Sequence, residues 1–574
     1  MGNKGISDIF KEIAIYLEMS DDRFRSRAYE NASEALLSLG GEVSEIYKNG
    51  GIKALEEIPG VGVSIAEKIE EVLKTGKLKY YEQFKKKIPV VISELMRVEG
   101  MGPKTIKILY QKLKVKNLTD LEKAARAGKI RNLEGFGIKS EENILKSLGF
   151  LGKSEKRILL GEILPVAKSV EIYLKKIKEV EKVMAAGSVR RRKETAGDID
   201  FLAISKKPEI VMEKFVNLPG VERIVAHGNT KSAIKLESGL DMDLRVVPKE
   251  SYGAALAYFT GSKEHNIVLR EIAIKKGWKL NEYGLFKGAK QIAGATEEEI
   301  YEKLGMDYIE PELREVTGEI EAAQKHKLPK LIGYGDLKGD LHVHSNWTDG
   351  ANSIEEMARA AMSLGHEYIV ITDHTKRLAM TRGLDEKRIQ QQWKEIDGLN
   401  KKLKSEGSKF VVLKGTECDI LKDGSLDLPD NILSKLDIVS VSVHSLFNLS
   451  REDQTNRIKK AIENPNVNIL NHPTGRIINK REAYQLDIDE IIKQAKKFGV
   501  AMQINAFPDR LDLKDEHIRK CVEAGVKMSI DTDSHSVNHL PFLEYGISQA
   551  RRGWATKNDI INAWPAEKML KMLN

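Results

Sequence analysis

The chain of 574 residues is poor in the features that mark extracellular and membrane proteins. Its two cysteines, Cys418 and Cys521, cannot build a disulfide framework or a thiolate zinc site. No apolar run reaches the ~18 residues that a membrane-spanning helix needs. The first eight residues also lack the apolar core of a signal peptide. We therefore expect a cytoplasmic protein that has no membrane partner.

Charge and histidine are distributed unevenly along the chain. The formal net charge is +8, with 41% hydrophobic and 31% charged residues, which is the balance of a globular protein. Residues 336–574 contain 35 basic and 35 acidic side chains, so the positive excess lies in residues 1–335. Nine of the 12 histidines follow residue 340. These differences predict an anion-binding front half and a metal-binding back half.

Changes in residue pattern divide the chain into domains. The first 150 residues indicate short helices broken by glycine turns, and strand-like runs begin near residue 183. After residue 336, apolar strand-like runs alternate with helical patterns, which predicts a distorted parallel β/α barrel. The predicted parts are two all-α domains at 1–83 and 84–150, an α/β domain at 151–247, a small α+β subdomain at 248–316, a linker at 317–335 and the barrel at 336–574.

Three segments of the first 150 residues share an apolar residue, a Gly-x-Gly sequence and a helix start. Glycines let the backbone approach a phosphate, and the amides of a following helix N-terminus bind it without reading bases. A tight turn between packed helices is the alternative for one copy, whereas three copies favour DNA binding. The pattern resembles the helix-hairpin-helix motif. The predicted DNA-binding glycines are Gly60, Gly62, Gly100, Gly102, Gly135 and Gly137.

The sequence after the first glycine pair, Ile65-Ala66-Glu67-Lys68-Ile69, resembles the N-terminal lyase domain of DNA polymerase beta. The resemblance implies that Lys68 is a catalytic Schiff-base nucleophile acting on 5′-deoxyribose phosphate. A lysine near other cations can have a lowered pKa and become nucleophilic. Arg25 and Tyr80 stand where that family usually has lysines. The lyase activity is therefore left open beside the alternative of a solvated helix lysine.

A pair of aspartates lies in the first strand-like region. Asp198 and Asp200 are two residues apart, so a strand would place both carboxylates on one face, where a divalent cation could lie between them. The preceding Gly187-Ser188 turn and its arginines supply donors that suit a polyphosphate. The combination resembles the nucleotidyltransferase superfamily.

A third metal-binding carboxylate is expected on the strand 241–247. By its match to the polymerase beta pattern, Asp243 is the catalytic residue, although Asp241 shares its face and an exchange of roles stays open. Downstream, the string from Ala257 to Asn266 resembles the nucleotide pocket of family X DNA polymerases. The resemblance implies two Mg²⁺ or Mn²⁺ ions on Asp198, Asp200 and Asp243. It also implies a nucleotide site of Gly187, Ser188, Arg191, Gly197, Tyr258, Phe259, Gly261, Asn266 and Arg270.

The last 240 residues place histidines and carboxylates at the ends of the predicted barrel strands. Loops at the C-terminal ends of such strands converge, so their side chains meet at one site. The predicted metal ligands are His342, His344, Asp349, His374, Glu417, His444, His472, Asp533 and His535. These residues fill the ligand positions of the polymerase and histidinol phosphatase (PHP) domain that the segment resembles. Imidazole and carboxylate ligands suit Zn²⁺, Mn²⁺ or Fe²⁺, and we expect up to three ions.

The resemblances imply a bacterial or archaeal family X DNA polymerase with a C-terminal PHP domain. In this view 151–247 is the palm and 248–316 the subdomain that binds the nascent base pair. We expect it to fill gapped or primer-template DNA from dNTPs during base excision repair, to remove nucleotides from 3′ ends, and to act as a monomer. Cleavage at abasic sites is left open. The alternatives are a template-independent nucleotidyltransferase with a phosphoesterase for small metabolites, or with an inactive, structural barrel.

Overall fold

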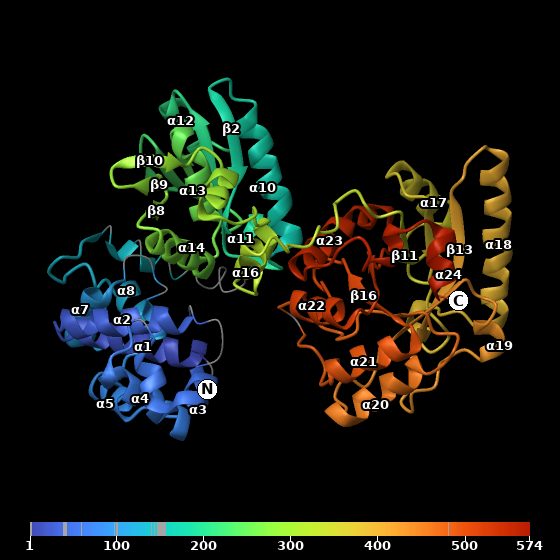
Figure 1. Cartoon of the computed structure of the whole chain (residues 1–574), viewed down its shortest axis with the longest axis horizontal. Helices are drawn as coiled ribbons and strands as arrows, with labels where there is room; N and C mark the ends of the chain where they lie inside the picture. Colours follow the sequence, from blue (N-terminus) through green and yellow to red (C-terminus); the bar gives the residue numbers. More distant parts are fainter. Residues whose placement is uncertain are drawn as a thin grey trace.

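The computed structural model describes residues 3–37, 39, 43–58, 60–96, 98, 101–138, 140–142, 144–145, 148, 157–479 and 481–573. Figure 1 shows the N-terminal helices and the mixed-sheet domain on one side and the barrel on the other. In the described ranges, no helix combines the length and apolar character needed to cross a membrane.

The N-terminal part is helical and has two apolar cores. One core gathers side chains such as Phe10, Leu36 and Ile69, and the other gathers Leu95 and Ile106 with their neighbours. The helices are α1 (Asn3–Met19), α2 (Arg23–Leu37), α3 (Val43–Glu56), α4 (Val63–Thr75), α5 (Lys79–Lys87), α6 (Ile92–Leu95), α7 (Pro103–Leu113) and α8 (Leu118–Arg126).

The domain predicted at 151–247, called the palm below, contains a five-stranded mixed sheet in the order β2-β4-β7-β6-β5. Strand β4 alternates partly exposed Asp198 and Asp200 with buried Ile199 and Phe201, so one face packs on the core and the other carries carboxylates. Its strands are β2 (Val180–Ala185), β4 (Asp198–Ser205), β5 (Val221–His227), β6 (Lys231–Leu236) and β7 (Asp241–Val246). Helices α10 (Leu160–Lys175) and α12 (Pro208–Val216) contribute buried residues to the same core.

The next subdomain joins helices to a small antiparallel sheet. Helices α13 (Tyr252–Thr260), α14 (Lys263–Lys275) and α15 (Glu297–Leu304) accompany β8 (Lys279–Asn281), β9 (Gly284–Lys287) and β10 (Lys290–Ala293). The segment 317–335, predicted as a linker, contains α16 (Glu319–Gln324), whose Ile320 and Ala323 are buried in the core of this subdomain. This part of the segment is therefore packed rather than extended.

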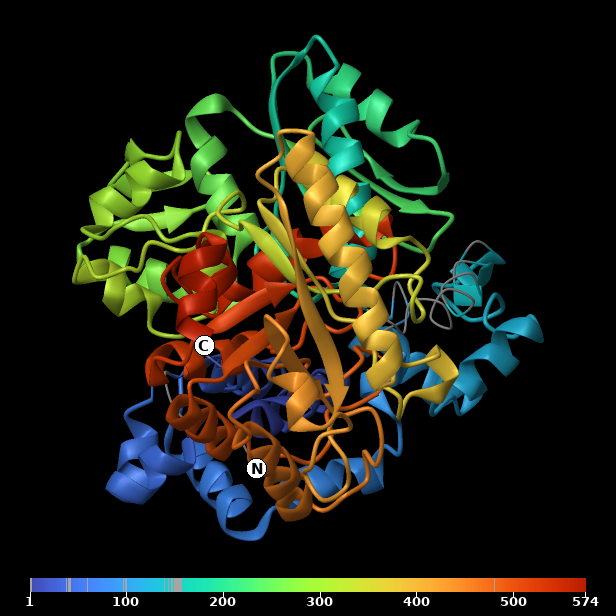
Figure 2. The same ribbon diagram turned by 90° about the vertical axis from the view of Figure 1, so that its right-hand side faces the viewer.

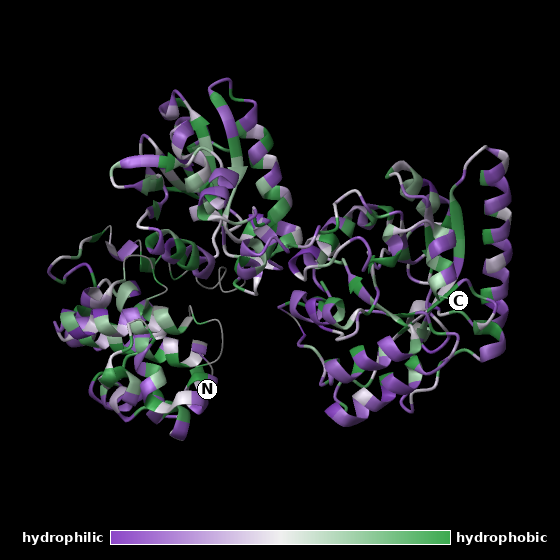
Figure 3. Cartoon of the chain, viewed as in Figure 1, coloured by the Kyte–Doolittle hydropathy of each residue, from purple (hydrophilic) through white to green (hydrophobic). Residues whose placement is uncertain are grey.

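The C-terminal half is a nearly closed parallel barrel in which seven strands pair in sequence order. They are β11 (Gly339–Val343), β12 (Tyr368–Ile371), β13 (Val411–Asp419), β14 (Ile438–Ser442), β15 (Ile469–Leu470), β16 (Ala501–Asn505) and β17 (Met528–Asp531). A parallel bridge from Val343 to Ser534 brings the first and last strands together. Most strand residues are buried because helices cover the barrel. In Figure 3 the long strand β13 is mostly coloured as hydrophobic.

Helices connect the barrel strands and cover its outside. They include α17 (Ile354–Ser363), α18 (Glu386–Ser405), α20 (Arg451–Ile462), α21 (Ile488–Phe498), α22 (Asp515–Ala524), α23 (Leu543–Arg552) and α24 (Ala566–Leu573). Figure 2 shows the long helix α18 lying along the outside of the barrel.

The palm and the barrel pack directly against each other. Leu511 and Tyr545 of the barrel belong to the apolar core of the palm. Around them, Glu544 pairs with Lys168 at 2.6 Å and with Arg192 at 3.2 Å. This contact surface brings helix α23 against the turn that follows β2.

Candidate active sites

Two neighbouring palm strands carry the predicted catalytic aspartates. Strands β4 and β7 are parallel, and their register pairs Asp200 with Asp243 and Asp198 with Asp241. Asp241 forms an ion pair of 2.6 Å with Lys235, a lysine whose side chain is 8% exposed, whereas Lys231 stands 3.6 Å from Asp243. The lysine pairing neutralises Asp241 more closely than Asp243.

The aspartates form a site of concentrated negative charge. Burial, and then repulsion from Asp198 and Asp243, raise the pKa of Asp200 to about 6. Burial and the charges of Asp243 and Asp241 also raise the pKa of Asp198. Carboxylates that repel one another in this way are suited to share divalent cations.

The Gly187-Ser188 turn begins a short helix beside these aspartates. The strand-like run that the sequence shows near residue 183 ends with β2 at Ala185, and α11 (Gly187–Arg190) follows. Gly187 has φ +62°, and a Cβ there would lie 3.2 Å from Oδ2 of Asp200. A glycine is therefore required for both the backbone conformation and the close approach to Asp200.

Arg191 extends from this turn toward the next subdomain. Its Nε donates to Glu315 at 3.0 Å, and its guanidinium also donates to the carbonyl of Thr260. Gly261 ends α13 at φ +70°, and a Cβ there would lie 3.1 Å from the Arg191 guanidinium. These contacts join two of the predicted nucleotide-binding segments.

Tyr258, Asn266 and Arg270 line one small cavity between α13 and α14. The Asn266 side chain donates to the carbonyl of Tyr258 at 2.7 Å. Phe259 lies with its ring under the guanidinium of Arg245, 4.5 Å from its centroid. The shared cavity thus brings Tyr258, Asn266 and Arg270 together.

Gly197 does not line this cavity. It immediately precedes β4, and a Cβ there would meet no heavy atom within 4 Å.

The three glycine turns share one local geometry. The amides of Val61, Met101 and Phe136 donate to the carbonyl three residues earlier, at 2.9, 3.1 and 3.0 Å. Gly60 and Gly135 have φ of +88° and +83°, while Gly62 and Gly102 are the N-caps of α4 and α7. A Cβ on Gly62, Gly102, Gly135 or Gly137 would meet nothing within 4 Å. These turns are open to a phosphate; Gly100 lies outside the described residues.

Lys68 lies on α4 beside both residues that depart from the lyase pattern. Its Nζ is 5.3 Å from the centroid of the Tyr80 ring, and Arg25 donates to the Tyr80 hydroxyl at 3.5 Å. Burial, and then the charge of Arg25, lower the pKa of Lys68, with Glu67 and Glu71 acting in the opposite direction. Lys68 also donates to the Ser64 carbonyl and hydroxyl, both at 2.9 Å.

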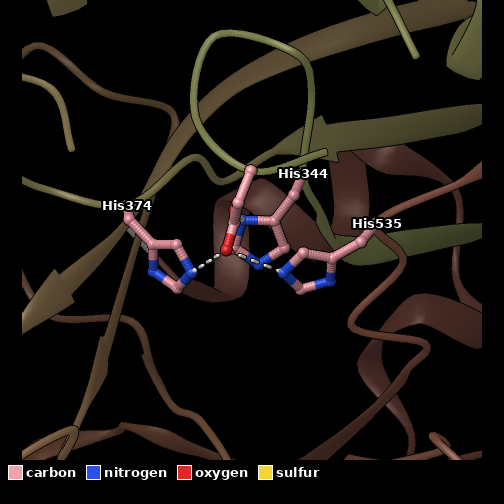
Figure 4. Close-up of side chains that lie close together, drawn as sticks. His344, His374 and His535 are labelled. Atoms are coloured by element: carbon pink, nitrogen blue, oxygen red, sulfur yellow. Dashed lines mark ion pairs between the residues drawn. The ribbon is translucent and has the colours of Figure 1, made fainter. Parts of the chain in front are cut away.

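The nine histidines and carboxylates of the barrel converge on one site. Three groups of ligand atoms lie close enough to hold a metal ion: His342, His344 and Asp533; His374, Glu417 and His444; and His344, Asp349, His374 and His535. Figure 4 shows three members of the last group, the imidazoles of His344, His374 and His535. His374 and His535 each form an ion pair of 3.5 Å with Asp349.

Glu417 lies at the centre of these ligands. Its Oε1 is 2.8 Å from Nε2 of His472 and 3.4 Å from Nε2 of His444. Its Oε2 faces His374 at 2.9 Å and His342 at 3.5 Å. The sequence analysis placed Glu417 at the end of a barrel strand, but β13 extends to Asp419, so Glu417 lies inside the strand. The two oxygens therefore face different histidines.

The donor set of this site suits metal ions. Burial, and then the neighbouring His535 and His374, lower the pKa of His344 to about 3, so this imidazole is neutral. Its buried Nδ1 has no hydrogen-bond partner among the described residues. Against the opposing effect of burial, carboxylates raise the pKa of His374 to about 10 and that of His535 to about 9. Buried imidazoles and carboxylates that face one another are an appropriate environment for divalent transition metals.

The sequence analysis missed residues that hold these ligands in place. The Gln503 amide contacts Nδ1 of His342 at 2.7 Å, and Asn505 donates to Asp533 at 3.1 Å. Asp419 lies 3.3 Å from Nδ1 of His444, and Arg510 lies 3.4 Å from Asp533. Asp419 lies in β13, Gln503 and Asn505 lie in β16, and Arg510 follows β16. A position in or after a barrel strand was the sequence feature that could have identified them. Such neighbours orient metal-binding side chains.

Family models match four parts of the chain. They describe a helix-hairpin-helix domain over residues 1–78, a SAM-like helix-hairpin-helix tandem over 92–149, a DNA polymerase beta thumb over 255–315 and a PHP domain over 340–479. These matches cover the glycine turns, the part of the predicted nucleotide site from Tyr258 to Arg270 and most of the barrel ligands.

Individual relatives match the whole chain or one half of it. A DNA polymerase/3′-5′ exonuclease PolX of Bacillus subtilis is 38% identical over 568 residues, covering 98% of each chain. A protein named "Probable phosphatase" from Thermoanaerobacter is 30% identical over 39% of this chain and 89% of its own. DNA polymerase lambda of Arabidopsis thaliana is 26% identical over 54% of this chain and 62% of its own.

Proposed function

The chain belongs to the family X DNA polymerases of the PolX type, which carry a C-terminal PHP domain, and we propose that it fills short gaps with the palm and trims 3′ ends with the barrel. It is a metal-dependent DNA polymerase and 3′-5′ exonuclease that acts on DNA and uses dNTPs. The register that places Asp200 beside Asp243, with Asp198 two residues away on the same strand, carries the assignment of the synthetic centre.

In the palm, Asp198, Asp200 and Asp243 would hold two Mg²⁺ or Mn²⁺ ions. Bound there, the ions would supply activation of the primer 3′-hydroxyl and neutralisation of the phosphates. Asp241 is the weaker candidate because Lys235 already pairs with it. The three proposed ligands project from two adjacent parallel strands, so a rigid sheet fixes their separation.

The nucleotide would lie between the palm turn and α13 and α14. The backbone and hydroxyl of Ser188 and the guanidinium of Arg191 would bind the phosphates. Tyr258 and Phe259 would lie beside the sugar, and Asn266 and Arg270 would reach the minor-groove edge, where acceptors are common to all base pairs. The shared cavity of Tyr258, Asn266 and Arg270 supports this arrangement.

In the barrel, the nine ligands would hold up to three Zn²⁺, Mn²⁺ or Fe²⁺ ions. Such ions would supply an activated water and a clamp for a phosphodiester. The two oxygens of Glu417 face different histidines, which supports its role as a bridging ligand. We further propose that His342, His344 and Asp533 hold the first ion, His444 and His472 the second, and Asp349, His374 and His535 the third. His374 also lies close to the second group.

The N-terminal domains would bind the DNA backbone through the glycine turns, and Lys68 would attack a 5′-deoxyribose phosphate. Its lowered pKa and the neighbouring Arg25 support this lyase step. Cleavage at abasic sites, a role in base excision repair, a monomeric state and a cytoplasmic location complete the proposal.

An assay on one gapped substrate tests the two-centre assignment. Asp200→Ala should abolish nucleotide addition and keep 3′ trimming, and His344→Ala should do the reverse, with Mg²⁺ and Mn²⁺ tested in parallel. Addition to a strand without template would favour the template-independent alternative. Loss of both activities in either folded variant would contradict separate centres. Borohydride trapping tests the lyase: Lys68→Ala should remove the covalent adduct.

A further inference from the structure

A cavity of about 560 Å³ lies where the palm meets the barrel. On the palm side it is lined by Ser188 and Arg191, the proposed phosphate-binding residues, and by Arg157. On the barrel side it is lined by Lys514, which precedes α22, and by Arg552 at the end of α23. One cavity thus joins the nucleotide-binding turn to a different domain.

The lining is strongly basic. Five basic side chains face two acidic ones, Glu194 and Asp515, and Ser188 and Thr195 add hydroxyl groups. Glu194 is already paired with Arg476 at 2.7 Å, and Asp515 with Arg552 at 2.6 Å. Glu315 also pairs with Arg191 at 3.0 Å and with Lys193 at 3.4 Å. Because that one carboxylate faces two cations, the charge around the cavity stays positive and suits a condensed phosphate.

Arg552 holds Arg191 from the barrel side. Its Nη1 donates to the Arg191 carbonyl at 2.9 Å and to Glu315 at 3.1 Å, and Glu315 in turn accepts from Arg191 at 3.0 Å. The Arg552 side chain is 4% exposed. It therefore fixes both the backbone and the side-chain partner of a proposed phosphate ligand.

Lys514 is the barrel cation that can respond to a ligand. It pairs with Glu516 at 3.2 Å, but both side chains are exposed, at 40% and 59%. An exposed ion pair of this kind contributes little free energy. The Lys514 ammonium can therefore leave Glu516 and turn into the cavity at a small cost in free energy. Arg552, by contrast, is held by two carboxylates.

We propose that this cavity is a condensed-phosphate site shared by the two domains, in which Lys514 of the barrel binds the triphosphate of the incoming nucleotide and the pyrophosphate that leaves. The inference rests on the proposed nucleotide site at Ser188 and Arg191. It makes the barrel a contributor to synthesis as well as to hydrolysis.

Steady-state kinetics of the full chain on gapped DNA tests this role. Loss of one charged phosphate contact in Lys514→Ala should raise KM for dNTP about fivefold, and charge reversal in Lys514→Glu should raise it at least about 20-fold. The inhibition constant of inorganic pyrophosphate should rise in parallel. The kcat, the Kd for gapped DNA and nuclease activity should stay within about twofold. Lys520→Ala is the matched control because Lys520 lies on the adjacent helix α22, pairs with Asp489 and does not line the cavity.

Three results would overturn the inference. They are an unchanged KM in Lys514→Glu, a rise in the Kd for DNA that accompanies the rise in KM, or an equal effect of Lys520→Ala. The second result would assign the cavity to the DNA backbone. A wrong assignment of the nucleotide site to Ser188 and Arg191 would give a different result. In that case Ser188→Ala and Arg191→Ala would leave KM for dNTP unchanged, although the wild-type chain polymerises.

Discussion

At the scale of single residues, close approach limits what the palm turn can accept. Gly187 adopts φ +62°, and a Cβ added there would lie 3.2 Å from Oδ2 of Asp200. Gly187→Ala should displace Asp200 and lower nucleotide addition at least about 100-fold, because small misplacements of reacting groups are costly. Single-nucleotide extension measures the effect. Gly220→Ala, at φ +80° with open space around it, controls for backbone strain alone and should extend normally.

Replacement of the two aspartates of β7, Asp241 and Asp243, should have very different effects on nucleotide addition. Asp243→Asn removes a proposed metal ligand and should lower extension at least about 1000-fold. Asp241→Asn removes the partner of Lys235 and should retain at least about a tenth of the activity. Extension rates over a range of Mg²⁺ concentrations compare the two variants. Equal losses would show that the carboxylates share the role.

The same scale explains why the sequence predicted some site residues and missed others. Asp198, Asp200 and the barrel histidines stand out because unusual residue types recur at strand spacing or at strand ends. Gln503 and Asn505 are ordinary polar residues, and only the fold shows that they contact His342 and Asp533. Arg552 likewise looks like a surface cation until α23 buries it against the palm.

At the scale of elements, buried ion pairs connect the palm to its neighbour. Glu297 of α15 pairs with Arg190 at 2.5 Å and with Arg314 at 2.6 Å. Against the effect of burial, these arginines lower its pKa from 4.5 to about 2. A carboxyl with a depressed folded-state pKa contributes stability above its unfolded pKa, here about 3 kcal/mol, and loses it as pH falls from about 4.5 to 2.

Glu297→Gln should therefore destabilise the chain near pH 7 and flatten the loss of stability below pH 4.5. Denaturant unfolding between pH 2 and 7, followed by tryptophan fluorescence, measures both effects. Glu298→Gln, an exposed neighbour on the same helix, is the control. A wild-type curve that stays flat from pH 4.5 to 2 would contradict the assigned pairing.

The geometry of the glycine turns leads to a separate prediction about the affinity for DNA. Gly102→Val finds open space in the protein, so the fold should persist, but the added side chain blocks a phosphate from the N-terminus of α7. Affinity for gapped DNA should fall about tenfold, and the slope of log K against log salt should decrease by about one. Binding titrations on several sequences should show equal losses, and Gly398→Val in α18 is the control. A change in sequence preference would contradict a phosphate contact.

Element boundaries were predicted best where apolar runs were long. The palm and barrel strands follow such runs, which is why their positions along the chain could be predicted from the sequence. The end of β2, the extension of β13 to Asp419 and helix α16 within 317–335 were missed. In each case tertiary contacts decide the local conformation: α16, for example, is stabilised by burial of Ile320 and Ala323.

At the scale of the whole molecule, the metal centre should be separable from synthesis. Glu417→Ala removes the carboxylate that faces five histidines and should lower bound metal by more than one ion per chain and abolish nuclease activity. Glu417→Gln should be nearly as damaging because its amide offers one oxygen and no charge. Polymerisation should continue in both. Metal analysis and parallel assays check this; full nuclease activity in Glu417→Ala would contradict the bridging role.

The contact between the palm and the barrel has a kinetic consequence. Helix α23 is held to the palm side by Glu544 and, through nearly buried pairs, by Arg551 and Arg552. Two centres fixed in this way cannot swing toward a stationary primer end, so the DNA itself has to travel between them. The choice between extension and removal then becomes a race between chemistry and DNA release. A mispaired end that slows extension gains time to reach the hydrolytic centre without any signal passing through the protein.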